Sequence, residues 1–255
     1  MRASDAGGAA AGASAAAAAD PLGAGIDVDP AALPAIAWLA PLAPEDRQRA
    51  ARSLRVRVVG EGAALCRQGE TAAHWFGVLD GLVVVSSLDQ VGHETTIAGI
   101  RAGGWFGEAS VLKQEVHRYQ VRALRDSRVA LLPSAVFHEL LQHSLPFNRF
   151  VMALLNERLS QFIAAREVER VRVPEVRVAR YLIELCNPTL YPGAGLLLRL
   201  RQCELAALAG LSRQRVNQAL ARLQERGAIR VDYGGVSVLD LERLRAIDEA
   251  ANPDA

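Results

Sequence analysis

Long apolar runs, paired cysteines and lysine are scarce in this 255-residue sequence. No run approaches the eighteen or more consecutive apolar residues that a membrane-spanning helix needs, so we expect no membrane partner. The start of the chain is rich in Ala and Gly but has no basic flank followed by a leucine-rich core, as a secretory signal requires. We therefore expect a cytoplasmic protein.

The cysteines and histidines do not form metal-binding patterns. The three cysteines, Cys66, Cys186 and Cys203, are far apart, odd in number and never in a Cys-x-x-Cys pair, which excludes a disulfide framework and a structural zinc site. His138 and His143 are five residues apart rather than the four of a paired helical metal site. We expect reduced thiols and no metal.

Enzyme signatures are also missing. The sequence has no nucleophile elbow, phosphate-binding loop or His-Glu-x-x-His motif, so we expect no catalytic residues and no enzymatic activity.

Lys113 is the only lysine, so nearly every cation is an arginine. The net charge of +1 is uninformative by itself, but residues 197–230 carry seven arginines against two glutamates, a local balance of +5. A basic segment of this kind favours an anionic partner such as nucleic acid. The arginines are Arg199, Arg201, Arg213, Arg215, Arg222, Arg226 and Arg230.

The composition and the apolar pattern of the sequence change several times along the chain. Residues 1–30 have almost no large apolar side chains and predict a disordered tail. A short helical stretch at 34–55 is followed by brief apolar runs at 56–59, 75–79, 82–85 and 129–132, separated by glycines, which predict a β barrel or sandwich. We divide the chain into 1–30, a β domain at 31–144, a helix and hinge at 145–173, a third region at 174–246 and a tail at 247–255.

After Pro133 the apolar period becomes helical. Apolar side chains recur every four residues at Phe147, Val151, Leu155, Leu159 and Ile163, whereas Glu157 and Arg158 point elsewhere, so we expect one helix of more than twenty residues. Its apolar stripe needs a partner, either the β domain or, as we expect, a second copy, which gives a homodimer through residues 147–165. Pro174 marks a hinge.

Residues 202–220 have the pattern of a helix-turn-helix. Ala206 allows two helices to approach, Gly210 suits the tight turn, and Ser212 is a good N-cap for the second helix. Leu205, Leu211, Val216 and Leu220 are expected to form the shared core.

The second helix presents side chains suited to base edges. We expect Ser212, Arg213, Gln214, Asn217 and Gln218 to contact DNA, with arginine suited to guanine and the amides to adenine. Residues 227–238 predict a two-stranded wing around a Gly-Gly turn, where Arg230 would contact phosphate. The alternative is a helical hairpin with an incidental arginine face.

These motifs resemble the Crp/Fnr superfamily of bacterial catabolite activator and fumarate-nitrate regulators. The resemblance covers residues 54–241 and includes Gly69-Glu70, Asp80-Gly81, residues 103–108 and residues 211–216. It implies an α+β architecture: an N-terminal double-stranded β-helix (jelly-roll) domain like those that bind cyclic nucleotides, a long dimerisation helix, and a C-terminal winged helix-turn-helix. It also implies double-stranded DNA with a palindromic operator, and RNA polymerase, as partners.

The resemblance also implies an effector site. The family's Gly-Glu pair and the arginine that follows it match Gly107, Glu108 and Arg118. Ala109 and Ser110 lie on a short helix whose N-terminal amides would face the cyclic phosphate. Tyr119 stands where nucleotide-binding members place a small hydroxyl residue, and is bulky enough to fill the phosphate site. Without the family, Glu108 and Arg118 are more simply an ion pair that braces a loop.

The effector stays open at this point. A cyclic mononucleotide, a cyclic dinucleotide, another small molecule and no effector at all are alternatives. Iron–sulfur sensing needs more cysteines than Cys66, and the haem-ligand candidates His74, His93 and His117 are more simply surface histidines. A cyclic-nucleotide module controlling an enzyme is the other functional class considered.

Overall fold

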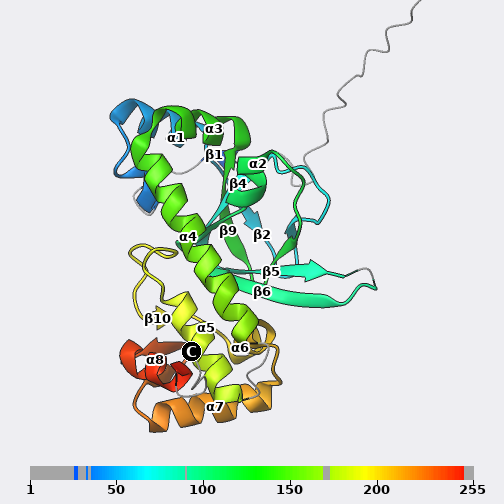
Figure 1. Ribbon diagram of the computed structural model, residues 1–255, viewed down its shortest axis with the longest axis vertical. Helices are drawn as coiled ribbons and strands as arrows, with labels where there is room; N and C mark the ends of the chain where they lie inside the picture. The colour runs from blue at the N-terminus through cyan, green and yellow to red at the C-terminus, as the bar shows by residue number, and fades with distance from the viewer. Residues whose placement is uncertain (1–25, 28–32, 34–35, 90, 169–172, 250–255) are drawn as a thin grey trace, which may run out of the picture.

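The computed structural model describes residues 26–27, 33, 36–89, 91–168 and 173–249 (Figure 1). A β domain comes first, then one long helix, then a smaller helical region with its own three-stranded sheet. This is the predicted α+β architecture. Among the described residues, no helix is both long enough and apolar enough to cross a bilayer.

Two antiparallel sheets form the β domain, and the chain passes back and forth between them. Each of the four predicted apolar runs lies in a strand. The first sheet has the order β1 (Ile26–Asp27), β2 (Arg55–Val59), β9 (Ser127–Pro133), β4 (His74–Asp80) and β7 (Trp105–Phe106). The second has the order β3 (Ala64–Cys66), β8 (Gln120–Ala123), β5 (Leu82–Leu88) and β6 (Glu94–Arg101).

The two predicted tails differ from the structure where it describes them. Ile26 and Asp27 form a strand that pairs with Val56 and Arg55, although the sequence predicted disorder through residue 30. The rest of that stretch lies outside the described residues. At the other end, α8 (Leu241–Glu249) continues past the boundary predicted at 246, because Ile247 is buried against the region before it.

Aromatic side chains fill the centre of the β domain. The rings of Trp75 and Trp105 have centroids 4.3 Å apart, and Trp38 and Phe147 pack around them at 5.3 to 5.7 Å. The predicted helical stretch at 34–55 comprises the short 3-10 helix η2 (Ala37–Leu39) and α1 (Pro44–Ser53). Together with α3 (Ser134–His143), these cover one end of the domain (Figure 1).

The long helix α4 (Leu145–Val168) runs from the β domain to the C-terminal region (Figure 1). Its predicted apolar stripe is not one face. A row of residues four apart rotates by about 40° per step around a helix with 3.6 residues per turn, so four steps carry it most of the way to the other side. Phe147 and Val151 are accordingly buried against the β domain, whereas Leu159 and Ile163 are exposed.

The C-terminal region has the predicted sequence of three helices followed by a hairpin. The helices are α5 (Pro174–Leu185), α6 (Gln202–Ala209) and α7 (Arg213–Glu225). The sheet has the order β10 (Leu197–Leu198), β12 (Gly235–Val238) and β11 (Ile229–Asp232). Pro174 is the first residue of α5, and residues 169–172 of the predicted hinge lie outside the described residues.

Candidate DNA-binding and effector sites

The turn between α6 and α7 depends on two residues. Gly210 ends α6 with a φ of +59°, a left-handed conformation that glycine adopts without a steric penalty. Ser212 then caps α7, and its Oγ accepts a hydrogen bond from the Arg215 backbone N–H at 3.3 Å. Both residues therefore take the places that the sequence predicted.

The two faces of α7 differ sharply. Val216, Leu220 and Leu223 are buried against the neighbouring helices, and Leu205 and Ala206 of α6 belong to the same core. All five predicted readers on this segment are exposed on the other face: Ser212, Arg213, Gln214, Asn217 and Gln218. The helix is thus anchored by one face and offers donors and acceptors on the other.

The wing is present, but Arg230 is already engaged. The Nε of Arg230 donates to Asp232 Oδ1 at 2.8 Å, and the Oδ2 of the same carboxylate accepts from Ser237 Oγ. Hydrogen bonds from Ser237 and Arg230 lower the pKa of Asp232. Tyr233 at the tip of the hairpin is fully exposed. A phosphate contact by Arg230 would therefore have to compete with Asp232.

Several arginines of the basic segment, residues 197–230, form ion pairs, so fewer of them can bind an anion than the net charge of +5 suggests. Arg226 pairs with Glu175 at 3.1 Å, and Arg201 pairs with Glu204 at 2.9 Å. Within the described part of the chain, no ion pair joins Arg213, Arg215 or Arg222, all of which are exposed on α7. Three arginines without an ion pair therefore lie on α7, and Arg199 of the same segment is also exposed without one among the described residues.

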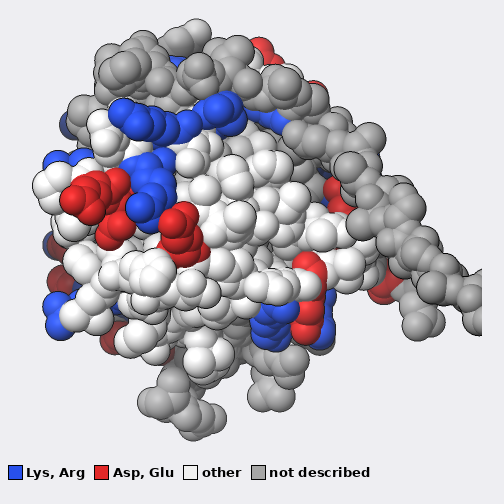
Figure 2. All heavy atoms as spheres, turned by 90° about the horizontal axis from the view of Figure 1, so that it is seen from above, with Lys and Arg blue, Asp and Glu red and all other residues white. Residues whose placement is uncertain are grey.

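The opposite end of the molecule has a different surface. Figure 2 looks down on this end, where some Lys and Arg side chains lie beside Asp and Glu and others form a row apart from them, amid a wide area of other residues. The uncompensated arginines of α7 lie at the far end of the structure from this view (Figure 1).

The predicted effector site contains a cavity of about 210 Å³ between the β domain and α4. Gly107, Glu108, Ala109 and Tyr119 line it, as predicted, together with apolar side chains of β5, β6, β7 and α4. Gly107 has a φ of +95° and begins the short helix α2 (Glu108–Lys113). Ser110 is buried nearby without lining the cavity, and Arg118 does not line it either.

Arg118 and Glu108 do not form the ion pair that the residues alone suggested. The Arg118 side chain is 75% exposed and donates to Glu115 Oε2 at 3.0 Å. Glu108 is only 5% exposed, and its Oε1 lies 3.9 Å from Nε of Arg158. Burial raises the pKa of the Glu108 carboxyl, while Arg158 and, more weakly, local hydrogen bonding oppose this shift.

Arg158 is the functional candidate that the sequence missed. It was expected to point away from the apolar ridge, but it is 9% exposed and lines the cavity. Its guanidinium donates to the backbone oxygen of Trp105 at 2.9 Å and to Gln161 Oε1 at 2.9 Å. Position 158 follows Val151 and Leu154 on the buried side of α4, so a seven-residue spacing from Val151 was the signal that could have found it.

Another expectation fails at His117, which is buried rather than on the surface. Its ring packs beside Phe76 and Tyr119, and burial lowers its pKa. No group of three or more His, Cys, Asp or Glu side chains suited to a metal ion occurs among the described residues.

Both halves of the chain match known families. Residues 56–144 match the cyclic nucleotide-binding domain family, and residues 176–247 match the Crp-like helix-turn-helix domain family. Transcriptional regulator SdrP of Thermus thermophilus is 33% identical over 181 residues, which are 69% of this chain and 84% of that protein. The chain belongs to the Crp/Fnr family of transcription regulators. It is therefore a transcription regulator rather than an enzyme.

A second relative agrees with this Crp/Fnr assignment, and a solved structure shares the fold. The cyclic AMP receptor protein of Thermus thermophilus is 31% identical over 208 residues, covering 81% of this chain and 94% of that protein. The structure of FixK2 from Bradyrhizobium japonicum has a TM-score of 0.62 at 19% identity, covering 76% of this chain and 97% of that one, and shares the fold.

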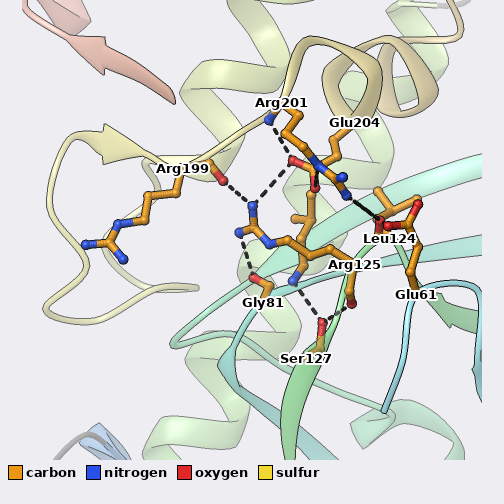
Figure 3. A network of polar contacts seen from close by, with 9 residues as sticks. Glu61, Gly81, Leu124, Arg125, Ser127, Arg199, Arg201 and Glu204 are labelled. Carbon is orange, nitrogen blue, oxygen red and sulfur yellow. Dashed lines mark hydrogen bonds and ion pairs between the residues drawn. The ribbon is translucent and has the colours of Figure 1, made fainter. Parts of the chain in front are cut away.

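In this Crp/Fnr chain the DNA-binding region docks on the β domain through a polar network (Figure 3). Arg125, between β8 and β9, donates to the backbone oxygens of Arg199 at 2.8 Å and Gly81 at 3.3 Å, and pairs with Glu204 at 3.4 Å. Arg201 joins the same Glu204 to Glu61 and to the Leu124 backbone oxygen. The start of α6 is thus tied to the β domain.

Contacts of Tyr191 and of α6 with β6 extend this docking toward the cavity. The Tyr191 hydroxyl donates to the Gly99 backbone oxygen of β6 at 2.9 Å, and Arg101 stacks over the Tyr191 ring with a centroid distance of 5.1 Å. A side chain on Gly99 would collide with Leu208 of α6. The strand β6 therefore contacts both the effector cavity and the first helix of the helix-turn-helix.

Proposed function

We propose that this regulator reads an operator with α7, with Arg213, Gln214, Asn217 and Gln218 contacting base edges and Ser212 positioning the helix. The observation that carries the proposal is the exposed row of arginine and amide side chains on a helix whose other face is buried. Arginine matches guanine O6 and N7, and asparagine or glutamine matches adenine N6 and N7. The wing and the uncompensated arginines would hold phosphates and fix the register, as would Arg230 once released from Asp232.

We further propose that the chain acts as a homodimer through α4. Leu145, Met152 and Leu159 are exposed at seven-residue intervals. Leu155 lies three residues after Met152, and Phe162 lies three residues after Leu159. This is the a and d spacing of a two-stranded coiled coil, and the stripe lies beside the buried face of Phe147, Val151 and Leu154. A second copy of α4 would cover this stripe, and the resulting two-fold axis would match a palindromic operator.

We propose that an effector in the cavity regulates DNA binding through α4 and the docked α6. Leu155, Arg158 and Leu159 line the cavity, and Leu155 and Leu159 also belong to the coiled-coil stripe. An effector that favours one arrangement of the two α4 helices would shift the population of dimers toward one spacing of the recognition helices. A cyclic nucleotide is the effector that the family suggests. RNA polymerase in the cytoplasm would then be the partner through which the bound dimer changes transcription.

The DNA-binding proposal is tested by titrating labelled random-sequence duplex DNA with the purified full chain at 50 and 200 mM salt. We expect the affinity for DNA to be at least tenfold lower at 200 mM than at 50 mM salt, because phosphate contacts release counterions from the DNA. Replacing Arg213, Arg215 and Arg222 together by Ala should weaken binding and flatten the salt dependence. Arg118→Ala, which removes one exposed cation from the β domain, is the control for charge lost outside α7 and should change neither the affinity nor its salt dependence. Equal losses in both variants would contradict the proposal.

A further inference from the structure

A groove of about 540 Å³ lies between α1 and the part of the chain just before it. Its α1 residues are spaced by three or four, so they form a single face of the helix, and they are Pro44, Arg47, Gln48 and Ala51. The rest of the lining is apolar and comprises Leu33, Ile36, Leu39 and Ala40. None of these residues lines the cavity beside α4, so the groove is a separate site.

The groove has an apolar floor and an open rim. Ile36 and Leu39 are 2% and 3% exposed and form the floor, whereas Arg47 and Gln48 are exposed at the rim. Small-molecule sites commonly have volumes of about 300 to 1,000 Å³, so the groove is large enough for a ligand. Each CH2 group of a ligand that leaves water for such a floor favours binding about fourfold. The lining therefore suits an alkyl chain.

The guanidinium of Arg47 is held in place but keeps its charge. Its Nε donates to the Leu39 backbone oxygen at 3.1 Å, and its Nη2 donates to the backbone oxygens of Ala40 at 2.6 Å and Leu42 at 3.0 Å. These oxygens carry no net charge, and no carboxylate pairs with Arg47 within the described part of the chain. A fixed cation therefore lies at the rim of an apolar groove.

Arg47 is also the one cation among the described residues that line the groove. Glu45 and Asp46 precede it on α1, but neither of them lines the groove. A guanidinium matches the two oxygens of a carboxylate, which carries one negative charge at neutral pH. A phosphate monoester carries a charge of about −1.5 to −2 and would need a second cation. The single cation therefore favours a carboxylate head group.

We propose that this groove binds a medium-chain alkyl carboxylate, whose head group contacts Arg47 and whose chain lies over Ile36 and Leu39. The groove shares no residue with the effector cavity or with α7, so this ligand is independent of the proposed function. Because α1 and α7 lie at opposite ends of the molecule, ligand binding is measured apart from DNA binding (Figure 1).

The test is a calorimetric titration of the full chain, without DNA and at pH 7.5, against hexanoate, octanoate, decanoate and 1-octanol. We expect saturable binding of octanoate, about tenfold tighter than that of hexanoate, because two more CH2 groups leave water. Decanoate should bind at least as tightly as octanoate. The alcohol has the same chain length without the charge and should bind about tenfold more weakly than octanoate.

Three results of this titration would overturn the proposal. Equal affinities of hexanoate and octanoate would mean that the chain is not buried, and equal affinities of octanoate and 1-octanol would mean that no cation binds the head group. No saturable heat with any of the four probes would mean that the groove has another occupant.

Three variants locate the ligand. Arg47→Gln should weaken octanoate binding about tenfold and leave 1-octanol binding unchanged, because it removes the cation and keeps the apolar floor. Arg52→Gln, the same change at an exposed position of α1 outside the lining, is the matched control and should change neither. Ala51→Phe fills the groove and should abolish binding of both probes. If thermal unfolding shows that Ala51→Phe does not fold, Ala51→Leu replaces it.

The variants also define results that would contradict the site. Equal losses of octanoate and 1-octanol in Arg47→Gln would mean that Arg47 shapes the groove rather than binds the carboxylate. Octanoate binding that a folded Ala51 variant does not reduce would place the ligand elsewhere, such as in the cavity beside α4. Either result, or an equal loss of octanoate in Arg52→Gln, would overturn the proposal without bearing on DNA binding by α7.

Discussion

Gln214 is the second residue of α7, and its exposed amide is one of the proposed contacts to a base edge. A glutamine both donates to and accepts from adenine, whereas a glutamate only accepts and suits the cytosine N4 amino group. Gln214→Glu is therefore expected to change the preferred base pair at one position of each half-site from A·T to C·G. The discrimination should be about 1 to 3 kcal/mol, measured by competition between operators that differ at that pair. Asn217→Asp is a second variant of the same kind, in which an amide also becomes a carboxylate. If Gln214→Glu changed the preference at a different base pair of the half-site, the Gln214 assignment would be refuted.

Glu184 of α5 gives a residue-scale prediction about pH. Burial raises the pKa of its carboxyl to about 7, although Arg180 and Arg158 lower it. Since the folded pKa exceeds the ordinary value of 4.5, the folded protein binds more protons than the unfolded chain between these values. The free energy of unfolding should therefore fall as pH rises from about 4.5 to 7.

Glu184→Gln removes this dependence. We expect it to raise the free energy of unfolding by about 1 to 2 kcal/mol at pH 8 and by little at pH 5, since the group is only partly buried. Urea unfolding at the two pH values measures the difference. The same increase in the free energy of unfolding at both pH values would show that the substitution acts through packing rather than through protonation of Glu184.

At the scale of one element, the apolar residues of α4 form two groups, one packed against the β domain and one proposed to contact a second copy. One face is buried against the β domain, and the neighbouring stripe, which is partly exposed, carries the spacing of a coiled coil. Phe162→Glu should convert the dimer to a monomer, because it places two charges in the apolar seam, whereas Ser160→Glu adds the same charge at an exposed position beside it. Sedimentation analysis distinguishes the two. A dimer that survives Phe162→Glu would place the interface elsewhere.

At the scale of the whole molecule, Arg125 ties the DNA-binding region to the β domain. Arg125→Ala removes two hydrogen bonds to backbone oxygens and one contact with Glu204, which is 2% exposed and keeps only Arg201. We expect the backbone amides of α6 to exchange about tenfold faster, which corresponds to about 1.4 kcal/mol. Arg128→Ala, at an exposed position of β9, is the control. Unchanged exchange in α6 would mean that Arg125 does not hold the docked state.

The sequence predicted elements better than it predicted partners. The Gly210 turn, the Ser212 cap and the exposed row on α7 follow from local rules, which is why the helix-turn-helix was predicted from the sequence. The pairings of Arg158 with Glu108 and of Arg201 with Glu61 could not be predicted, because each joins segments whose approach depends on the whole fold. Even the apolar row on α4 was misread as one face, because a four-residue interval drifts around the helix.

The most direct test of the DNA-binding account is selection of binding sites from a random duplex library by the purified full chain. The account predicts enrichment of a palindrome whose half-sites are one helical turn apart, about 10 base pairs centre to centre, and loss of that enrichment in Arg213→Ala. Recovery of no enriched sequence, or of the same sequence by Arg213→Ala, would contradict it.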